Sequence, residues 1–211
     1  QLTRTTAVMV RAPISKTMPL NAPAPKSDFK PIDPGTYVAR CYSVVDLGTH
    51  QEEWKGKPKD SRKVRITWEL PTELKEFETE TGKKMLPLVI GKEYTLSMGE
   101  KSNLRKDIQS WIGTTLDDME AAGFDVFSLV GMDCMISVAH KTSGAGKTYA
   151  IVQSVTRLLK GTTCPPQVNP SVTFNVYEWN QEVYDGLPNF MKERIDESLE
   201  RKQKPTEELD F

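Results

Sequence analysis

Apolar and polar residues alternate strictly along residues 62–70, a pattern typical of a strand with one buried face. The apolar positions are Val64, Ile66, Trp68 and Leu70. Alternating or β-branched and aromatic runs predict four more strands. These strands cover residues 36–45, 92–98, 133–140 and 147–156. Between them we expect a polar loop over 46–61, a charged loop or extended hairpin over 71–87, and a tight turn at 143–146.

A period near 3.6 places Leu104, Ile108, Trp111 and Ile112 on one face and predicts a helix over 104–112. Ser102-Asn103 can cap its start, and Gly113 is suited to end it. A second amphipathic helix is expected over 187–203, with Pro188 near its first turn.

The predicted order is three strands, a helix and two strands, which indicates a mainly β chain with minor α. This order is the plan of an OB-fold, a five-stranded Greek-key barrel, although several folds share it. We therefore expect a flexible basic, proline-rich arm over 1–28, an OB-fold domain over 29–160 and a linker over 161–186. A C-terminal helix over 187–203 and an acidic tail over 204–211 would follow.

Charge is distributed unevenly along the 211 residues, although the net charge is only −1. Residues 1–27 carry +4, residues 28–160 are neutral, and residues 161–211 carry −5. Oppositely charged ends of this kind favour electrostatic self-competition. The three cysteines are widely spaced and form no CxxC pair, which predicts a reducing cytoplasm without disulfides or a zinc site. No apolar run reaches the roughly 20 residues of a membrane helix.

Catalytic motifs find little support in the sequence. The run Ser143-Gly-Ala-Gly-Lys-Thr148 imitates a phosphate-binding loop, but Lys141 stands where its first glycine belongs, and Lys147 opens a strand rather than a helix. His50 and His140 are the only histidines and form no ligand pair. We expect a non-enzymatic protein without cofactor or metal.

Basic residues crowd the expected loop at 46–61 and the polar side of the following strand, with Trp54 standing among them. Lysines and arginines can follow phosphates while an aromatic ring stacks on bases. The candidate nucleic-acid contacts are Arg40, Tyr42, Trp54, Lys55, Lys57, Lys59, Arg62, Lys63, Arg65, Lys141 and Lys147. The alternative is an ordinary solvated face, diluted by Glu52, Glu53, Asp60 and Glu69. Trp68 and Trp111 are assigned to the core.

The chain ends on Glu207, Glu208, Asp210 and Phe211, where an apolar ring is surrounded by carboxylates. The ring can fill an apolar pocket while the acids meet basic residues on its rim, so these four residues are candidate partner contacts. This tip resembles the acidic, phenylalanine-ended tails of bacterial and phage single-stranded-DNA-binding proteins. It departs from the bacterial ending in having Leu-Asp-Phe in place of Ile-Pro-Phe.

The likeness extends beyond the tail. The runs Pro31-Ile-Asp-Pro-Gly-Thr-Tyr-Val-Ala-Arg40 and Tyr94-Thr-Leu-Ser-Met-Gly-Glu-Lys-Ser-Asn-Leu-Arg-Lys-Asp107, together with Asp46-Leu-Gly48, 64–71, Gly146-Lys-Thr-Tyr149 and the Leu187-Pro188 helix, resemble a family of phage and prophage proteins. These proteins are encoded among replication and recombination genes and are regarded as single-stranded-DNA-binding proteins. The resemblance spans about residues 29–200 and supplies no residue roles.

We therefore expect a phage-type single-stranded-DNA-binding protein without marked sequence preference, acting in replication or recombination in the bacterial cytoplasm. Its tail would recruit replication or recombination proteins, and a homo-oligomer is compatible with the sequence. The alternative is an adaptor whose barrel binds a replication or host protein. Near-neutral body charge favours the adaptor, whereas Trp54 among the lysines favours DNA.

Overall fold

The computed structural model describes residues 30–79 and 82–202. The chain divides into two units, 1–30 and 31–211, and all the helices and strands described belong to the second unit. The predicted arm over 1–28 and the predicted tail over 204–211 lie outside the described residues.

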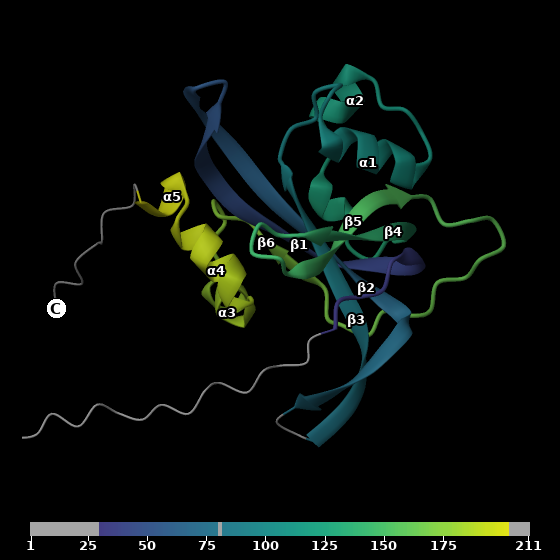
Figure 1. The fold of residues 1–211 in the computed structure, drawn as a ribbon. Coiled ribbons are helices and arrows are strands. Elements are labelled where there is room, and N and C mark those ends of the chain that lie inside the picture. Colours follow the sequence, from purple (N-terminus) through teal and green to yellow (C-terminus); the bar gives the residue numbers. More distant parts are fainter. Residues whose placement is uncertain (1–29, 80–81, 203–211) are drawn as a thin grey trace, which may run out of the picture. The chain divides into compact units, whose positions relative to one another are not determined.

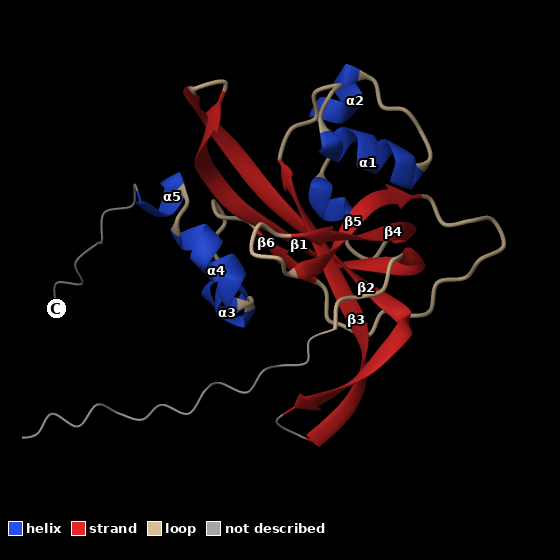
Figure 2. Cartoon of the chain, viewed as in Figure 1, coloured by secondary structure: helices blue, strands red, loops and turns tan. Residues whose placement is uncertain are grey.

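Strands dominate the second unit (Figure 2). They are β1 (Gly35–Trp54), β2 (Lys57–Thr79), β3 (Gly82–Thr95), β4 (Asp133–Thr142), β5 (Thr148–Thr156) and β6 (Val172–Phe174). The helices are α1 (Asn103–Ile112), α2 (Asp118–Ala122), the 3₁₀ turn η1 (Val126–Leu129), α3 (Gln181–Gly186), α4 (Asn189–Asp196) and α5 (Leu199–Lys202).

The main strands form one antiparallel sheet in the order β3-β2-β1-β4-β5, and the short β6 pairs in parallel with β1. The sheet is curled and stays open, like half of a barrel (Figure 1). The predicted mainly β class and the helix between the third and fourth strands are therefore confirmed.

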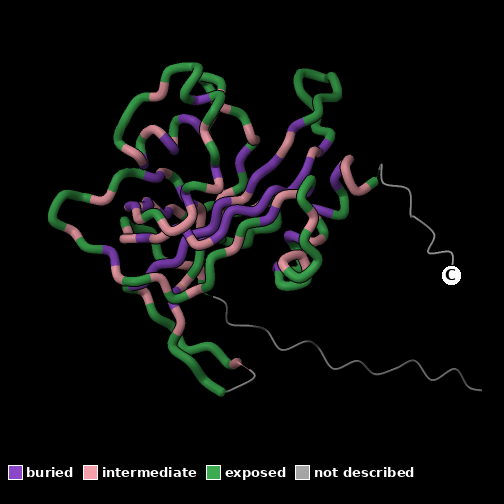
Figure 3. Tube along the Cα trace, turned by 180° about the vertical axis from the view of Figure 1, so that it is seen from behind, coloured by how far each residue is buried: buried purple, intermediate pink, exposed green. Residues whose placement is uncertain are grey.

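The hydrophobic core lies inside the curl of the sheet, under α1 (Figure 3). The alternation of β2 is confirmed, because Val64, Ile66, Trp68 and Leu70 are all buried. The rings of Trp68 and Trp111 meet with their centroids 5.8 Å apart, and the Trp111 indole donates to the Asp133 carbonyl over 2.7 Å. The assignment of both tryptophans to the core is thus confirmed.

Helix α1 begins and ends where the sequence predicts. The Ser102 hydroxyl accepts a hydrogen bond from the Arg105 backbone N–H over 3.1 Å, which is a standard N-cap. Gly113 closes the helix in the left-handed conformation with φ of 72°.

The prediction of a loop over 46–61 is wrong, because β1 and β2 continue through this segment as a hairpin. Trp54 pairs with Lys57 at the end of the hairpin, and only Lys55 and Gly56 form the turn. Their φ angles of 52° and 75° are both positive, as a type I′ hairpin turn requires. Polar residues on both faces made an exposed hairpin look like a loop.

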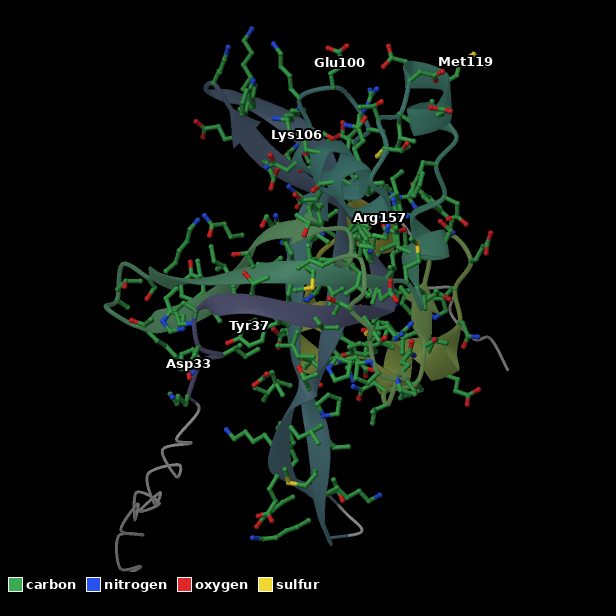
Figure 4. All side chains as sticks on the ribbon, turned by 90° about the vertical axis from the view of Figure 1, so that its right-hand side faces the viewer. Asp33, Tyr37, Glu100, Lys106, Met119 and Arg157 are labelled. Carbon is green, nitrogen blue, oxygen red and sulfur yellow. The ribbon has the colours of Figure 1, made fainter. Side chains whose placement is uncertain are left out.

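For residues 71–87, the hairpin alternative is confirmed. Beyond a register shift between Leu70 and Leu74, β2 pairs with β3 as far as Thr79 and Gly82. The tight turn at 143–146 is also confirmed: the Ser143 N–H donates to the Lys147 carbonyl over 2.9 Å between β4 and β5. The three hairpins extend in different directions from the sheet (Figure 4).

Residues 161–186 were predicted as a linker, but they pack on the sheet and contain β6 and α3. The predicted single helix over 187–203 is also interrupted, since α4 ends at Asp196 and α5 starts at Leu199. Together α3 and α4 build a second core against Val45 and Leu47 of β1. Its buried members also include Phe174, Val176, Leu187, Met191 and Ile195.

The three cysteines are unpaired and buried. Burial raises the pKa of the Cys41 thiol to about 12, so this thiol stays protonated at neutral pH. Among the described residues, no helix is long and apolar enough to cross a membrane.

Candidate nucleic-acid interface

The predicted contacts fall into two groups, because some basic side chains are already engaged by the protein and others are exposed. Arg40 belongs to the first group. Its guanidinium donates to the carbonyl of Gly131 over 2.6 Å and to the carbonyls of Cys164 and Pro165 over 3.3–3.4 Å. Arg40 therefore holds the segment after β5 on the sheet, and in this conformation its guanidinium is engaged by the protein's own backbone.

Arg62 is engaged in a similar way. Its guanidinium bonds to the buried Asp46 carboxylate, with the shortest contact at 2.6 Å, and lies 4.6 Å from the centre of the Tyr177 ring. The hydrogen bonds that Arg62 donates to Asp46 raise the pKa of Arg62, so the guanidinium stays charged. Arg62 connects β2 to the C-terminal segment.

Arg65 is covered by α4. Its guanidinium lies 4.9 Å from the centre of the Phe190 ring, and a side chain at Gly91 would collide with it. Burial lowers the pKa of Arg65, and its Nε atom has no hydrogen-bond partner among the described residues. The middle of β2 thus presents its arginines to the protein's own aromatic rings.

Lys63 and Tyr42 are also less accessible than predicted. The Lys63 ammonium bonds to Glu52 over 2.7 Å and to the Thr95 hydroxyl over 3.0 Å. Tyr42 is half-buried at a β-bulge, and burial followed by the nearby Glu69 raises its pKa. Neither residue offers a fully exposed group.

The end of the β1–β2 hairpin is exposed, as predicted. Trp54 is 62% exposed, and the ammonium groups of Lys55 and Lys59 lie 6.0 and 5.7 Å from the centre of its ring. Lys57 is exposed directly across the ladder from Trp54. Among the described residues, these three lysines make no ion pair with a carboxylate.

The acidic residues that would dilute this surface are placed elsewhere. Residues opposite each other in an antiparallel ladder share a face, so Trp54, Lys57 and Lys59 lie on one face of the hairpin. Glu53 and Asp60 belong to the other face. Glu52 lies on the tryptophan face but is paired with Lys63, and this hydrogen bond lowers its pKa.

Glu69, the fourth such acid, is fully buried. Its carboxylate accepts hydrogen bonds from the Val168 and Asn169 backbone N–H groups and the Asn169 side chain, all over 2.7–2.8 Å. It anchors the segment after β5 rather than facing solvent. Because these four acids are paired, buried or on the other face, the Trp54 face of the hairpin keeps an exposed basic and aromatic surface whose charge they do not cancel.

A groove of about 760 Å³ lies beside this hairpin. One side is formed by Trp54, Lys59 and Lys63. The other is formed by the end of β3, the start of α1 and the loop between them, in which Glu100 lies (Figure 4). The remaining lining residues are Lys92, Glu93, Tyr94, Thr95, Ser97, Gly99, Glu100, Lys101, Ser102, Asn103 and Leu104.

Two of the groove's lysines are available and two are already paired. Lys59 and Lys101 form no ion pair among the described residues, whereas Lys92 bonds to Asp107 over 2.7 Å and Lys63 bonds to Glu52. The groove also has two acids, Glu93 and Glu100, and Glu93 forms an ion pair with Arg194 over 3.2 Å. The groove therefore retains positive charge beside an exposed indole.

The basic residues at the start of α1, which are Lys101, Arg105 and Lys106, are divided in the same way. Arg105 is buried and donates to Asp118 over 2.8 Å and to the Leu116 carbonyl over 2.6 Å, so it is structural. Lys106 is exposed on the outer side of α1 (Figure 4). Only Lys101 of this patch lines the groove.

The third hairpin contains Lys141 and Lys147, both exposed as predicted. Lys141 lies directly across from Tyr149, which is 43% exposed. Tyr149 was not among the predicted contacts, because its alternation with neighbouring residues indicates only a strand position. The aromatic ring next to Gly146-Lys147-Thr148 was the signal that could have identified it.

The groove itself was also missed, although the signal for it was present. Lys92, Tyr94 and Lys101 follow one another closely in the sequence, but Tyr94 was read only as a strand residue. Its side chain is largely buried and its hydroxyl donates to Asp107 over 2.8 Å. Burial and Asp107 raise the pKa of Tyr94, which keeps it neutral.

The chain matches no protein-family model and no curated protein sequence. Among the described residues, no group of histidine, cysteine, aspartate or glutamate side chains is arranged to hold a metal ion. Glu207, Glu208, Asp210 and Phe211 lie outside the described residues.

Proposed function

We propose that this chain binds single-stranded DNA without marked sequence preference, along the groove beside the β1–β2 hairpin. The observation that carries the proposal is the exposed Trp54 ring, flanked by lysines that make no ion pair among the described residues. An exposed ring offers a stacking platform to any base, because every base has a π-face. The lysines Lys57, Lys59 and Lys101 would meet the phosphates on either side.

The fold supports this proposal. The order β3-β2-β1-β4-β5, with α1 between β3 and β4, follows the plan of an OB-fold, and we propose that the half-barrel is an OB-fold without ladder pairing between β3 and β5 among the described residues. OB-folds use the loop between their first two strands and the loop between their last two for oligonucleotides. Both corresponding hairpins carry exposed lysines and an exposed aromatic residue in this chain.

The first turn of α1 adds a second reason to expect an anion in the groove. Ser102, Asn103 and Leu104 line the groove, so the start of the helix faces it. Backbone N–H groups at a helix start favour negative charge. The outer side of β2 is a poorer site, since Phe190 already lies over Arg65.

The acidic tail would have two functions in this proposal. Its carboxylates would compete with DNA for the groove, and Phe211 would dock on a replication or recombination protein of the phage or its host. Deleting 207–211 should tighten binding to oligo-dT, most at low salt, because it removes a tethered competitor. Phe211→Ala should leave DNA affinity nearly unchanged but abolish partner binding. Unchanged affinity after the deletion would contradict the competition.

A fluorescence titration with labelled oligo-dT and a duplex of equal length, at two salt concentrations, tests the DNA proposal. Single strands should bind more tightly than the duplex. If about four phosphates are contacted, log K should fall against log salt with a slope near −3. Equal affinity for both, or no binding at low salt, would contradict the proposal.

A protein-recognition adaptor is the second candidate, favoured by the neutral net charge of residues 28–160. In that case the groove would hold a partner protein instead of nucleic acid. The same titration separates the candidates, because an adaptor of this kind would bind neither oligonucleotide.

A further inference from the structure

The second hairpin of the sheet is an arm that extends away from the groove. It consists of Leu74–Thr79 of β2 and Gly82–Pro87 of β3, beyond the register shift that follows Leu70. The arm points away from the β1–β2 hairpin, at the opposite end of the long strand β2 (Figure 1). Leu74, Phe77 and Met85 are all exposed on it.

The ladder sorts the arm's side chains onto two chemically different faces. Phe77 pairs with Lys84 and Lys75 with Leu86, so these residues share one face, which we call the lysine face. Leu74, Glu76, Glu78, Lys83 and Met85 share the other, which we call the paired face. On the paired face, Lys83 bonds to Glu76 over 2.7 Å.

The lysine face keeps its charge available. Lys75 and Lys84 are exposed and make no ion pair among the described residues, and the described ladder positions on this face include no carboxylate. Glu80 and Thr81 lie outside the described residues.

The same cross-strand pair recurs in each hairpin of the sheet. Trp54 lies opposite Lys57, Phe77 opposite Lys84, and Tyr149 opposite Lys141. In the first two hairpins, acids occupy the opposite face, as Glu53 and Asp60 do in one and Glu76 and Glu78 do in the other. In these two hairpins the separation of charge leaves an aromatic ring next to available ammonium groups.

We propose that the lysine face of the β2–β3 arm is a second contact site for single-stranded nucleic acid. Phe77 would stack on a base, while Lys75 and Lys84 would each meet a phosphate. The inference rests on the proposed function, which it extends from the groove to a hairpin at the far end of β2. A folded protein partner would bury apolar side chains, and the paired face exposes Leu74 and Met85 for such a contact, whereas on the lysine face the exposed Phe77 ring lies beside Lys75 and Lys84.

Two pairs of matched variants test the site, because neighbouring residues point to opposite faces. Lys84→Gln and Lys83→Gln remove the same charge from the same strand. We expect Lys84→Gln to make the salt slope for oligo-dT shallower by about 0.7, the share of one phosphate on a single strand. Lys83→Gln should leave the slope unchanged, because Lys83 is neutralised by Glu76.

Phe77→Ala and Met85→Ala form the second pair. Phe77→Ala should weaken binding of a long oligo-dT roughly fivefold or more, the loss expected for one stacked base. Met85→Ala should bind as the unmodified protein does. All four side chains are exposed, so melting temperatures should agree and would confirm that the variants fold.

The outcomes separate the arm from the groove. If the unmodified protein binds oligo-dT and all four variants bind equally well, the arm proposal is overturned while the groove proposal stands. If the unmodified protein fails to bind at low salt, both are overturned. If Lys84→Gln and Phe77→Ala change self-association in sedimentation but not DNA affinity, the lysine face contacts a second copy of the chain, and the DNA proposal for the arm is overturned.

Discussion

Two regions of β2 carry similar side chains but differ in what those side chains contact. Near the β1–β2 turn, Lys57 and Lys59 are exposed beside the open Trp54 ring. A few residues further along the same strand, Arg62 and Arg65 lie against Tyr177 and Phe190 of the C-terminal segment. In one region the cation is available to a ligand, and in the other an aromatic ring of the protein already covers it.

The difference shows that a basic cluster in the sequence is a site only where the fold leaves it unpaired. Covering the arginines also has a structural benefit, because the second core depends on the C-terminal segment staying on β1. A guanidinium stacked on a ring loses little of its hydrogen-bonding capacity and can attach one segment to another. The arginines are therefore attachment points, and the lysines are the candidate contacts.

Replacing the two tryptophans of this part of the sheet should give the largest contrast. Trp68→Ala should lower the free energy of unfolding by roughly 3–5 kcal/mol, because it empties a fully buried site against Trp111. Trp54→Ala should change stability by less than about 0.5 kcal/mol, since its ring is exposed. Urea denaturation measures both, and a Trp54 variant that unfolds early would mean that core and site have been exchanged.

Low pH should destabilise the region in which the C-terminal segment covers Arg62 and Arg65, and Glu200 is the residue that titrates there. Burial raises the pKa of this carboxyl, but hydrogen bonds from the Thr49 N–H and hydroxyl and from the Tyr177 hydroxyl outweigh it and lower the pKa to about 2. Because the folded pKa is below the unfolded value of about 4.3, the stabilisation is complete above that pH. It is lost as the pH falls towards 2.

Glu200→Gln should therefore destabilise the protein at pH 7 by about 1 kcal/mol, after allowance for solvent screening. The difference between the variant and the unmodified protein should shrink as the pH falls from about 4.3 to 2. Urea denaturation across this range checks the prediction. A difference that stays constant with pH would assign the effect to packing and not to charge.

The exposed region should respond to single charges through its salt dependence. Lys59→Gln should make the salt slope for oligo-dT shallower by about 0.7, because one phosphate contact is lost. Lys160→Gln is the matched control, since this exposed lysine follows β5 and does not line the groove. Equal slopes for the two variants would remove Lys59 from the site.

The elements that were predicted correctly are determined by interactions between residues that are close together in the sequence. Ser102 and Gly113 bound α1 through bonds within a few residues, and the alternation around Trp68 reports one buried face directly. Trp54 was recognised as exposed because polar residues surround it. Local patterns of this kind are visible in a single sequence.

The roles that were missed depend on partners far along the chain. Arg40 bonds to carbonyls 124 and 125 residues away, and Glu69 caps backbone groups 99 and 100 residues away. No local pattern distinguishes these side chains from exposed ones. The hairpin over 46–61 was missed for a different reason, because residues 51–60 are exposed on both faces and carry no hydrophobic period.

The comparison of the two regions is tested most directly by the affinity of Trp54→Ala and Phe190→Ala for labelled oligo-dT. Both rings are about half exposed or more, and both lie near a basic side chain of β2. We expect Trp54→Ala to lose roughly 1–3 kcal/mol of binding free energy and Phe190→Ala to bind as the unmodified protein does. Normal binding by Trp54→Ala, with a loss for Phe190→Ala, would place the DNA on the covered region and contradict the account.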